Sequence, residues 1–185
     1  MKSLLLLVIF VPITAIKVSA DSEGAAIPVV TASAFGPCFF ASTPKGKGSG
    51  AAYELQPDGS FRRLWKVTGW FTGPVYLSQN GRYLVRMGDW AIGSGPSTDD
   101  LAVAFYDRGK RLARYSTADL VKDPSKVVQS TSHYCWLANE NLFSPDRHKE
   151  PAPALNDDSQ RFALKTIDGI IYVFDITTGK IESRQ

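Results

Sequence analysis

Hydrophobic and polar residues alternate along much of this chain, with the period of two that is typical of β-strands. In the segment 82–87, large apolar side chains occupy alternate positions from Tyr83, and both arginines fall on the opposite face. In 101–105 the large side chains lie on one face and alanines on the other. An alanine face indicates that a second sheet or another backbone packs closely against that strand.

Glycine turns separate the apolar runs. They fall at 57–60, 80–81, 107–110, 168–169 and 178–179. Asn or Asp beside Gly tolerates the positive φ angles that tight hairpins require, so these turns predict antiparallel hairpins. One run, 170–174, is apolar at every position, which predicts a central strand covered on both faces.

Two segments depart from the strand pattern. Ser116 is followed three residues later by Asp119, which is typical of a capped helix start, and Pro124 ends or restarts that helix. We therefore expect one or two short helices within 117–130. The segment 139–159 carries three prolines and several charges, and it predicts a long surface loop.

A weak internal repeat runs through the chain. The segment 36–42 resembles 73–78, which lies 37 residues further on. The strand–turn–strand pattern of 53–67 matches that of 104–115, and the tail from 162 to 181 supplies a third copy. The fold class predicted is therefore mainly β, with three antiparallel blade-like repeats of three or four strands each.

The tail segment 171–181, Ile-Tyr-Val-Phe-Asp-Ile-Thr-Thr-Gly-Lys-Ile, resembles the strand–turn–strand unit of β-propellers of the WD40, quinoprotein and YVTN types. The resemblance implies a partial or open propeller, because closed rings have four to eight blades. Two architectures stay open: a homodimer that closes a six-bladed ring, and an open sandwich of sheets.

The chain departs from those propeller families in the residues that carry their function. The chain lacks the Trp-Asp dipeptide and the Gly-His pair of WD40 blades, and the cofactor residues of quinoproteins have no counterpart, so no cofactor is predicted. The whole chain also resembles a family of uncharacterised exported bacterial proteins. That resemblance implies no activity and assigns no functional residue.

The N-terminal segment predicts export. Lys2 precedes an apolar run from Leu4 to Ile16, and Val18-Ser19-Ala20 is typical of a signal-peptide cleavage site. The alternative is an uncleaved anchor. We expect a signal peptide over 1–20, a flexible tether over 21–36 and a single β domain over 37–185. The mature protein would be secreted or periplasmic, with no membrane span.

The formal charge is +3, and Lys2 and Lys17 within the expected signal peptide supply two of those positive charges. A nearly neutral mature chain argues against a nucleic-acid partner. The two cysteines, Cys38 and Cys135, can pair in an oxidising compartment. The alternative is that both are buried free thiols.

Catalytic and metal-binding motifs are sparse. No Gly-x-Ser-x-Gly elbow exists, and His133 and Cys135 share a strand face, which allows a thiol–imidazole pair but is equally typical of a structural aromatic strand. Cys38, His133, Cys135 and His148 match no standard zinc spacing, so no metal site is predicted.

Aromatic residues are concentrated in two glycine-rich connections. Trp70, Phe71 and Trp90, with Arg86 nearby, form a candidate ligand-binding patch for a protein or carbohydrate partner. The alternative is that these rings close the ends of the sheets. Together these patterns favour an exported, non-enzymatic binding or interaction module, with a small exported hydrolase and a structural envelope component as alternatives.

Overall fold

The computed structural model describes residues 24–141, 144–156, 158 and 160–185. The predicted signal peptide over 1–20 lies outside the described residues. Within these ranges no helix is both long and apolar enough to cross a membrane.

The chain folds into four antiparallel sheets, as the mainly-β prediction requires. Three of them have four strands, each in chain order. The first sheet contains β1 (Val29–Ala32), β2 (Cys38–Thr43), β3 (Ser49–Leu55) and β4 (Phe61–Thr68). The second contains β5 (Val75–Leu77), β6 (Tyr83–Met87), β7 (Leu101–Asp107) and β8 (Lys110–Ser116). The third contains β11 (Ala154–Leu155), β12 (Arg161–Lys165), β13 (Ile171–Asp175) and β14 (Lys180–Arg184), and a two-stranded sheet joins β9 (Val128–Gln129) to β10 (Tyr134–Cys135).

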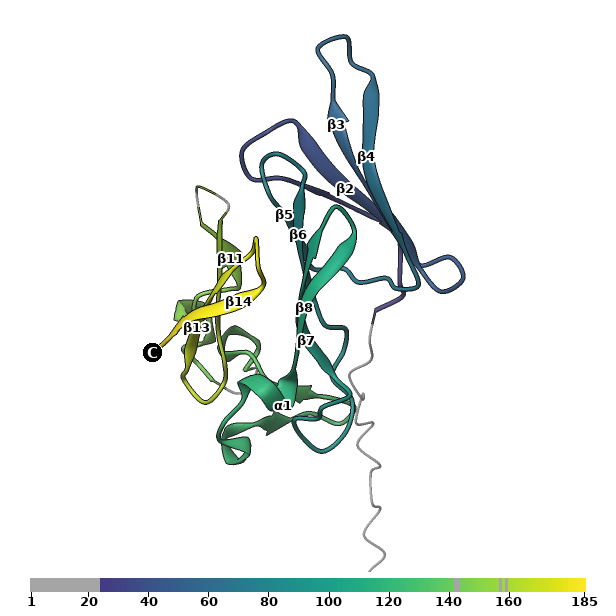
Figure 1. Cartoon of the computed structure of the whole chain (residues 1–185). Coiled ribbons are helices and arrows are strands. Elements are labelled where there is room, and N and C mark those ends of the chain that lie inside the picture. The colour runs from purple at the N-terminus through teal and green to yellow at the C-terminus, as the bar shows by residue number, and fades with distance from the viewer. Residues whose placement is uncertain (1–23, 142–143, 157, 159) are drawn as a thin grey trace, which may run out of the picture.

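The second sheet lies between the other two (Figure 1). Its face toward the first sheet packs in one apolar core, which contains Cys38, Phe40, Ala52, Trp65, Val67, Val75, Leu77, Leu84, Ala104 and Tyr106. Its opposite face packs against the third sheet in another core, which includes Val85, Met87, Val103, Phe105, Phe162, Leu164, Tyr172 and Phe174. The two cores together make the second sheet the central layer.

Strand β7 is covered on both faces, since Ala102 through Tyr106 are all buried. Ala104 packs in the core with the first sheet, and Phe105 packs in the core with the third. The small side chain of Ala104 therefore lies where the first and second sheets pack closely, as expected. The prediction of double coverage for 170–174 is wrong, because β13 buries one face only and leaves Ile171 exposed. Strand β13 belongs to an outer layer of the stack.

Two hydrogen bonds join successive sheets at glycine turns. The Trp65 indole on β4 donates to the carbonyl oxygen of Gly81 at 2.6 Å, and the Tyr115 hydroxyl on β8 donates to that of Gly179 at 3.0 Å. Each glycine belongs to a turn of the following sheet and has a positive φ. A buried indole or phenol needs such a partner, so the turns position each sheet on the preceding one.

Two predictions about chain organisation need correction. The expected tether over 21–36 contains strand β1, which pairs with β2 from Val29↔Ser42 to Ala32↔Phe39. Pairing with β2 makes residues 29–32 a strand, although the residues around them are small and polar. The repeat between 36–42 and 73–78 is out of phase, because it aligns the second strand of the first sheet with the first strand of the second.

The helix prediction is confirmed in its position. α1 (Thr117–Leu120) begins with a capping box in which Ser116 and Asp119 satisfy each other's backbone N–H groups, and the 3₁₀ helix η1 (Pro124–Lys126) follows. The segment 139–159 is not wholly a loop. It contains the end of η2 (Ala138–Glu140), then η3 (Arg147–Lys149) and β11.

Replacing Gly179 with alanine should destabilise the protein more than replacing Gly59. Both have positive φ, which costs a Cβ-bearing residue about 1–2 kcal/mol. A Cβ on Gly179 would lie 2.5 Å from the Ala113 Cβ, whereas a Cβ on Gly59 meets no atom within 4 Å. Urea unfolding should show an additional loss of about 1–3 kcal/mol for Gly179→Ala. Equal losses would contradict the close packing of this turn.

Candidate functional site

A pocket of about 830 Å³ opens where several connections between strands converge. Its walls come from 24–27, from the β4–β5 connection at 71–74, from 87–91 after β6, and from 133–140 around β10 and η2. Ala152 and Pro153, which precede β11, complete the lining. The sheets fix the ends of these connections, so segments far apart in the sequence meet at one site.

Two of the predicted patch residues, Phe71 and Trp90, line this pocket. Trp70 does not line it, because its ring packs at 6.0 Å from that of Phe40 and at 5.5 Å from that of Tyr106. Trp70 therefore fits the alternative considered for these aromatic residues, in which a ring closes the end of a sheet.

Arg86 also lies outside the pocket lining. Its guanidinium carbon sits 4.5 Å from the Trp70 ring centroid, in a cation–π arrangement. Its Nη2 atom lies 3.4 Å from Asp89 Oδ2. Arg86 thus braces Trp70 and the start of the β6–β7 connection.

The histidine of the pocket wall is held by its neighbours. The His133 ring centroid lies 3.8 Å from that of Trp90, and Nδ1 lies 2.6 Å from the Ser130 hydroxyl. On its other side, Nε2 lies 3.8 Å from the Cys135 sulfur. The structure therefore brings His133 and Cys135 together, as their shared strand face predicted.

Both cysteines are buried and neither forms a disulfide, so the predicted Cys38–Cys135 bond is not formed in this structure. Cys38 packs in the core between the first and second sheets, whereas Cys135 lies on β10. The two residues therefore belong to different sheets. Burial raises the pKa of the Cys38 thiol, and the nearby Glu54 adds to that effect.

The sequence analysis missed Glu140, which also lines the pocket. Glu140 is an exposed residue, yet the protein around its carboxyl partly desolvates it and raises its pKa to about 7. The backbone N–H of Leu137 opposes this shift. Glu140 also contributes to the raised pKa of Tyr76, whose main cause is burial. A glutamate in a Pro-rich loop carries no local signal of such surroundings.

Two further polar atoms in the lining have no hydrogen-bond partner: Thr72 Oγ1 and Asn139 Oδ1, both buried. Such atoms are costly to leave unpaired, and neither oxygen is open to solvent in this structure. Among the described residues, no group of three or more His, Cys, Asp or Glu side chains is arranged to hold a metal ion.

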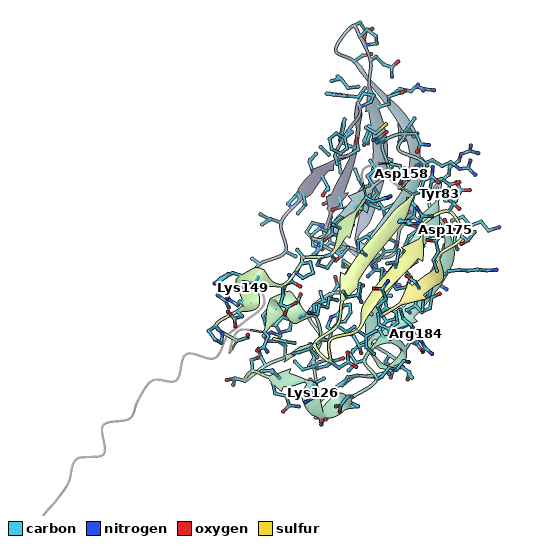
Figure 2. The ribbon with its side chains drawn as sticks, turned by 90° about the vertical axis from the view of Figure 1, so that its left-hand side faces the viewer. Tyr83, Lys126, Lys149, Asp158, Asp175 and Arg184 are labelled. Carbon is cyan, nitrogen blue, oxygen red and sulfur yellow. The ribbon has the colours of Figure 1, made fainter. Side chains whose placement is uncertain are left out.

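A smaller hollow of about 330 Å³ lies at the β5–β6 turn, and Asn80, Tyr83 and Asp158 are among its lining residues. Tyr83 and Asp158 of this hollow are labelled in Figure 2, as is Asp175 of β13. The Asp175 carboxylate accepts hydrogen bonds from the Thr177 N–H and hydroxyl, both at 2.7 Å, so it is occupied in the β13–β14 turn.

Comparison with protein-family models and with curated proteins found no match. Among solved structures, the chain is similar to Sqt1 from Saccharomyces cerevisiae. The sequence identity is 13% and the TM-score 0.38, over 88% of this chain and 52% of that one. The chain therefore spans about half the length of that protein.

The raised pKa of Glu140 predicts a pH-dependent stability. The folded protein holds this proton up to about pH 7, whereas the unfolded chain releases it near the ordinary value of 4.5. The stabilising contribution is complete below pH 4.5 and is lost as the pH rises through 7. The melting temperature of Glu140→Gln should therefore rise relative to wild type between pH 5 and pH 8.

The matched control is Glu182→Gln, since Glu182 forms an exposed ion pair with Arg161 and does not line the pocket. The Gln variant at 140 leaves Asp89 and His133 in place, so the difference isolates the Glu140 carboxyl. Parallel pH profiles for wild type and Glu140→Gln would show that its pKa is not raised by folding.

Proposed function

We propose that this protein is an exported, non-enzymatic binding module of propeller-like sheets, and that it takes a small, largely apolar molecule or side chain into the pocket. The observation that carries this proposal is the pocket itself. Its volume of about 830 Å³ lies within the roughly 300–1,000 Å³ of small-molecule sites. An aromatic lining with a few polar atoms is also typical of such sites.

The local chemistry favours binding over hydrolysis. A thiol nucleophile must reach its substrate, but Cys135 is only 1% exposed. The Ser130 hydroxyl, which lies against His133, also accepts hydrogen bonds from the backbone N–H groups of Ser132 and His133. That hydroxyl serves a local turn, which supports the binding module over the hydrolase alternative.

Export remains part of the proposal and rests on the sequence alone. A signal peptide over residues 1–20 would deliver the protein to the periplasm or the medium. The segment 24–27, which follows the expected cleavage site closely, lines the pocket. Mass spectrometry of the protein secreted or released from the periplasm would show whether it begins at Asp21.

Filling the pocket should abolish ligand binding. Gly73 lines it, and a Cβ there meets no atom within 4 Å, so Gly73→Phe should fold normally and occupy the pocket. The test is an NMR titration with 2-phenylethanol as a neutral probe. We expect saturable shifts at residues 71–74 and 133–140 in wild type, and none in Gly73→Phe.

The control is Gly95→Phe. Gly95 also precedes a proline and has open space around its Cβ position, but it does not line the pocket. This variant should keep the wild-type shifts. The absence of saturable binding by wild type, or unchanged binding by Gly73→Phe, would refute the pocket as the binding site.

A second observation favours a protein partner at the first sheet. Its outer face carries an aromatic cluster of Phe39, Tyr53 and Phe61, with centroid separations of 5.3 Å from Phe39 to each of the other two. Phe61 is 63% exposed. Exposed aromatic clusters of this kind are typical of interaction surfaces.

The repeated architecture indicates what this face would contact. The β7–β8 turn at Gly109 packs on β4, and the β13–β14 turn at Gly179 packs on β8. The corresponding β3–β4 turn at Gly59 extends into open space, and its hairpin projects beyond the other sheets (Figure 1). We infer that a second copy of this chain supplies the sheet against which this face packs, in a twofold ring of six sheets.

Light scattering tests this homodimer. Wild type should have twice the mass of one chain at about 100 µM, and Phe61→Ser should be a monomer. Phe35→Ser is the control, because Phe35 is 58% exposed but lies outside the aromatic cluster. A wild-type monomer at that concentration would exclude the ring and leave the open stack of three sheets.

A further inference from the structure

The charged groups that line the pocket are all of one sign. Asp89 and Glu140 carry carboxylates, and no described lining residue is Lys or Arg. Asp89 lies against Arg86, with 3.4 Å between the nearest atoms. Glu140 forms no ion pair with any described Lys or Arg. Where Glu140 is ionised, the pocket therefore holds a negative charge that a bound cation would complement.

The unpartnered polar atoms of the pocket are oxygens. Asn139 Oδ1 accepts hydrogen bonds only, and Thr72 Oγ1 has two acceptor lone pairs besides its proton. Both atoms are buried, and the oxygens that a bound molecule can reach are those of the Glu140 side chain, which is exposed. The carboxylate of Glu140 adds two more acceptors. A molecule that satisfies this site is accordingly a hydrogen-bond donor.

Aromatic rings supply the remaining recognition surface. Phe71, Tyr76, Trp90, Tyr134 and Trp136 all line the pocket. The faces of such rings carry partial negative charge and attract ammonium groups. The same rings bury the apolar body of a ligand.

We propose that the pocket binds a protonated amine carried on an aromatic or apolar body, with the Glu140 carboxylate as its counter-ion. The inference rests on the function proposed above and specifies the ligand class. The ammonium group would donate to the Glu140 carboxylate and lie against the ring faces of the pocket wall. The apolar body would lie against Trp90. A free amine and a lysine side chain of a peptide share this chemistry.

Three probes of nearly equal shape test the charge preference: phenethylamine as a cation, 2-phenylethanol as a neutral molecule and 3-phenylpropanoate as an anion. Affinities are measured by NMR titration of wild type at pH 8, where Glu140 is ionised. We expect phenethylamine to bind about tenfold more tightly than the alcohol, as a charge-assisted contact with aromatic support should provide. The anion should bind more weakly than both.

Two variants then test whether Glu140 causes the preference for the amine over the alcohol. Glu140→Gln keeps the shape of the side chain and should bring phenethylamine to the affinity of the alcohol. Glu182→Gln, outside the pocket, should leave the tenfold preference unchanged. N-acetyl-lysine methylamide represents the lysine side chain of a peptide. The amine that binds more tightly, and that loses this affinity in Glu140→Gln, shows whether the ligand is a free amine or a peptide lysine.

The outcomes separate this inference from the proposed function. Equal affinities for amine and alcohol, or an undiminished preference in Glu140→Gln, would overturn the amine inference while the pocket remains a binding site. Failure of all the probes to bind would refute both. A tenfold preference that Glu140→Gln abolishes would support both.

Discussion

The burial of the second sheet on both faces is the constraint on which the structure depends. Strand β7 contributes to both cores, with Ala104 toward the first sheet and Phe105 toward the third. Full burial of one large apolar side chain stabilises a protein by about 1.5–3 kcal/mol. A single sheet could not bury its apolar face alone. Fully buried residues such as Phe40, Phe105 and Phe174 therefore hold the three sheets together.

Close sheet packing requires turns that approach the preceding sheet. Gly109 and Gly179 have positive φ, and their Cα atoms face the backbone or side chains of the neighbouring sheet. Trp65 and Tyr115 each donate a hydrogen bond to a glycine carbonyl of the following sheet. Apolar packing sets the distance between layers, and these directional hydrogen bonds fix the position of each turn on the preceding sheet.

This rigid stack positions the connections that form the pocket. Loops positioned by a stable scaffold commonly carry the residues that bind other molecules. Here they bring Thr72, Trp90 and Glu140 from three separate connections to one cavity. Among the described residues, the site combines a carboxylate that forms no ion pair, two unpartnered oxygens and several aromatic rings.

What the sequence determined by itself was local. Period-two alternation, Asn-Gly and Asp-Gly turns and the Ser116–Asp119 capping box specify strands, hairpins and a helix start through contacts between near neighbours. Tertiary structure decided which layer was central, so β13 leaves a face open although its sequence is apolar throughout. It also decided the candidate site: Phe71 and Trp90 were foreseeable as loop aromatics, but the exclusion of Trp70 and the position of Glu140 were not. Those outcomes depend on which segments the stacked sheets bring together, and short-range patterns carry no information about such distant neighbours.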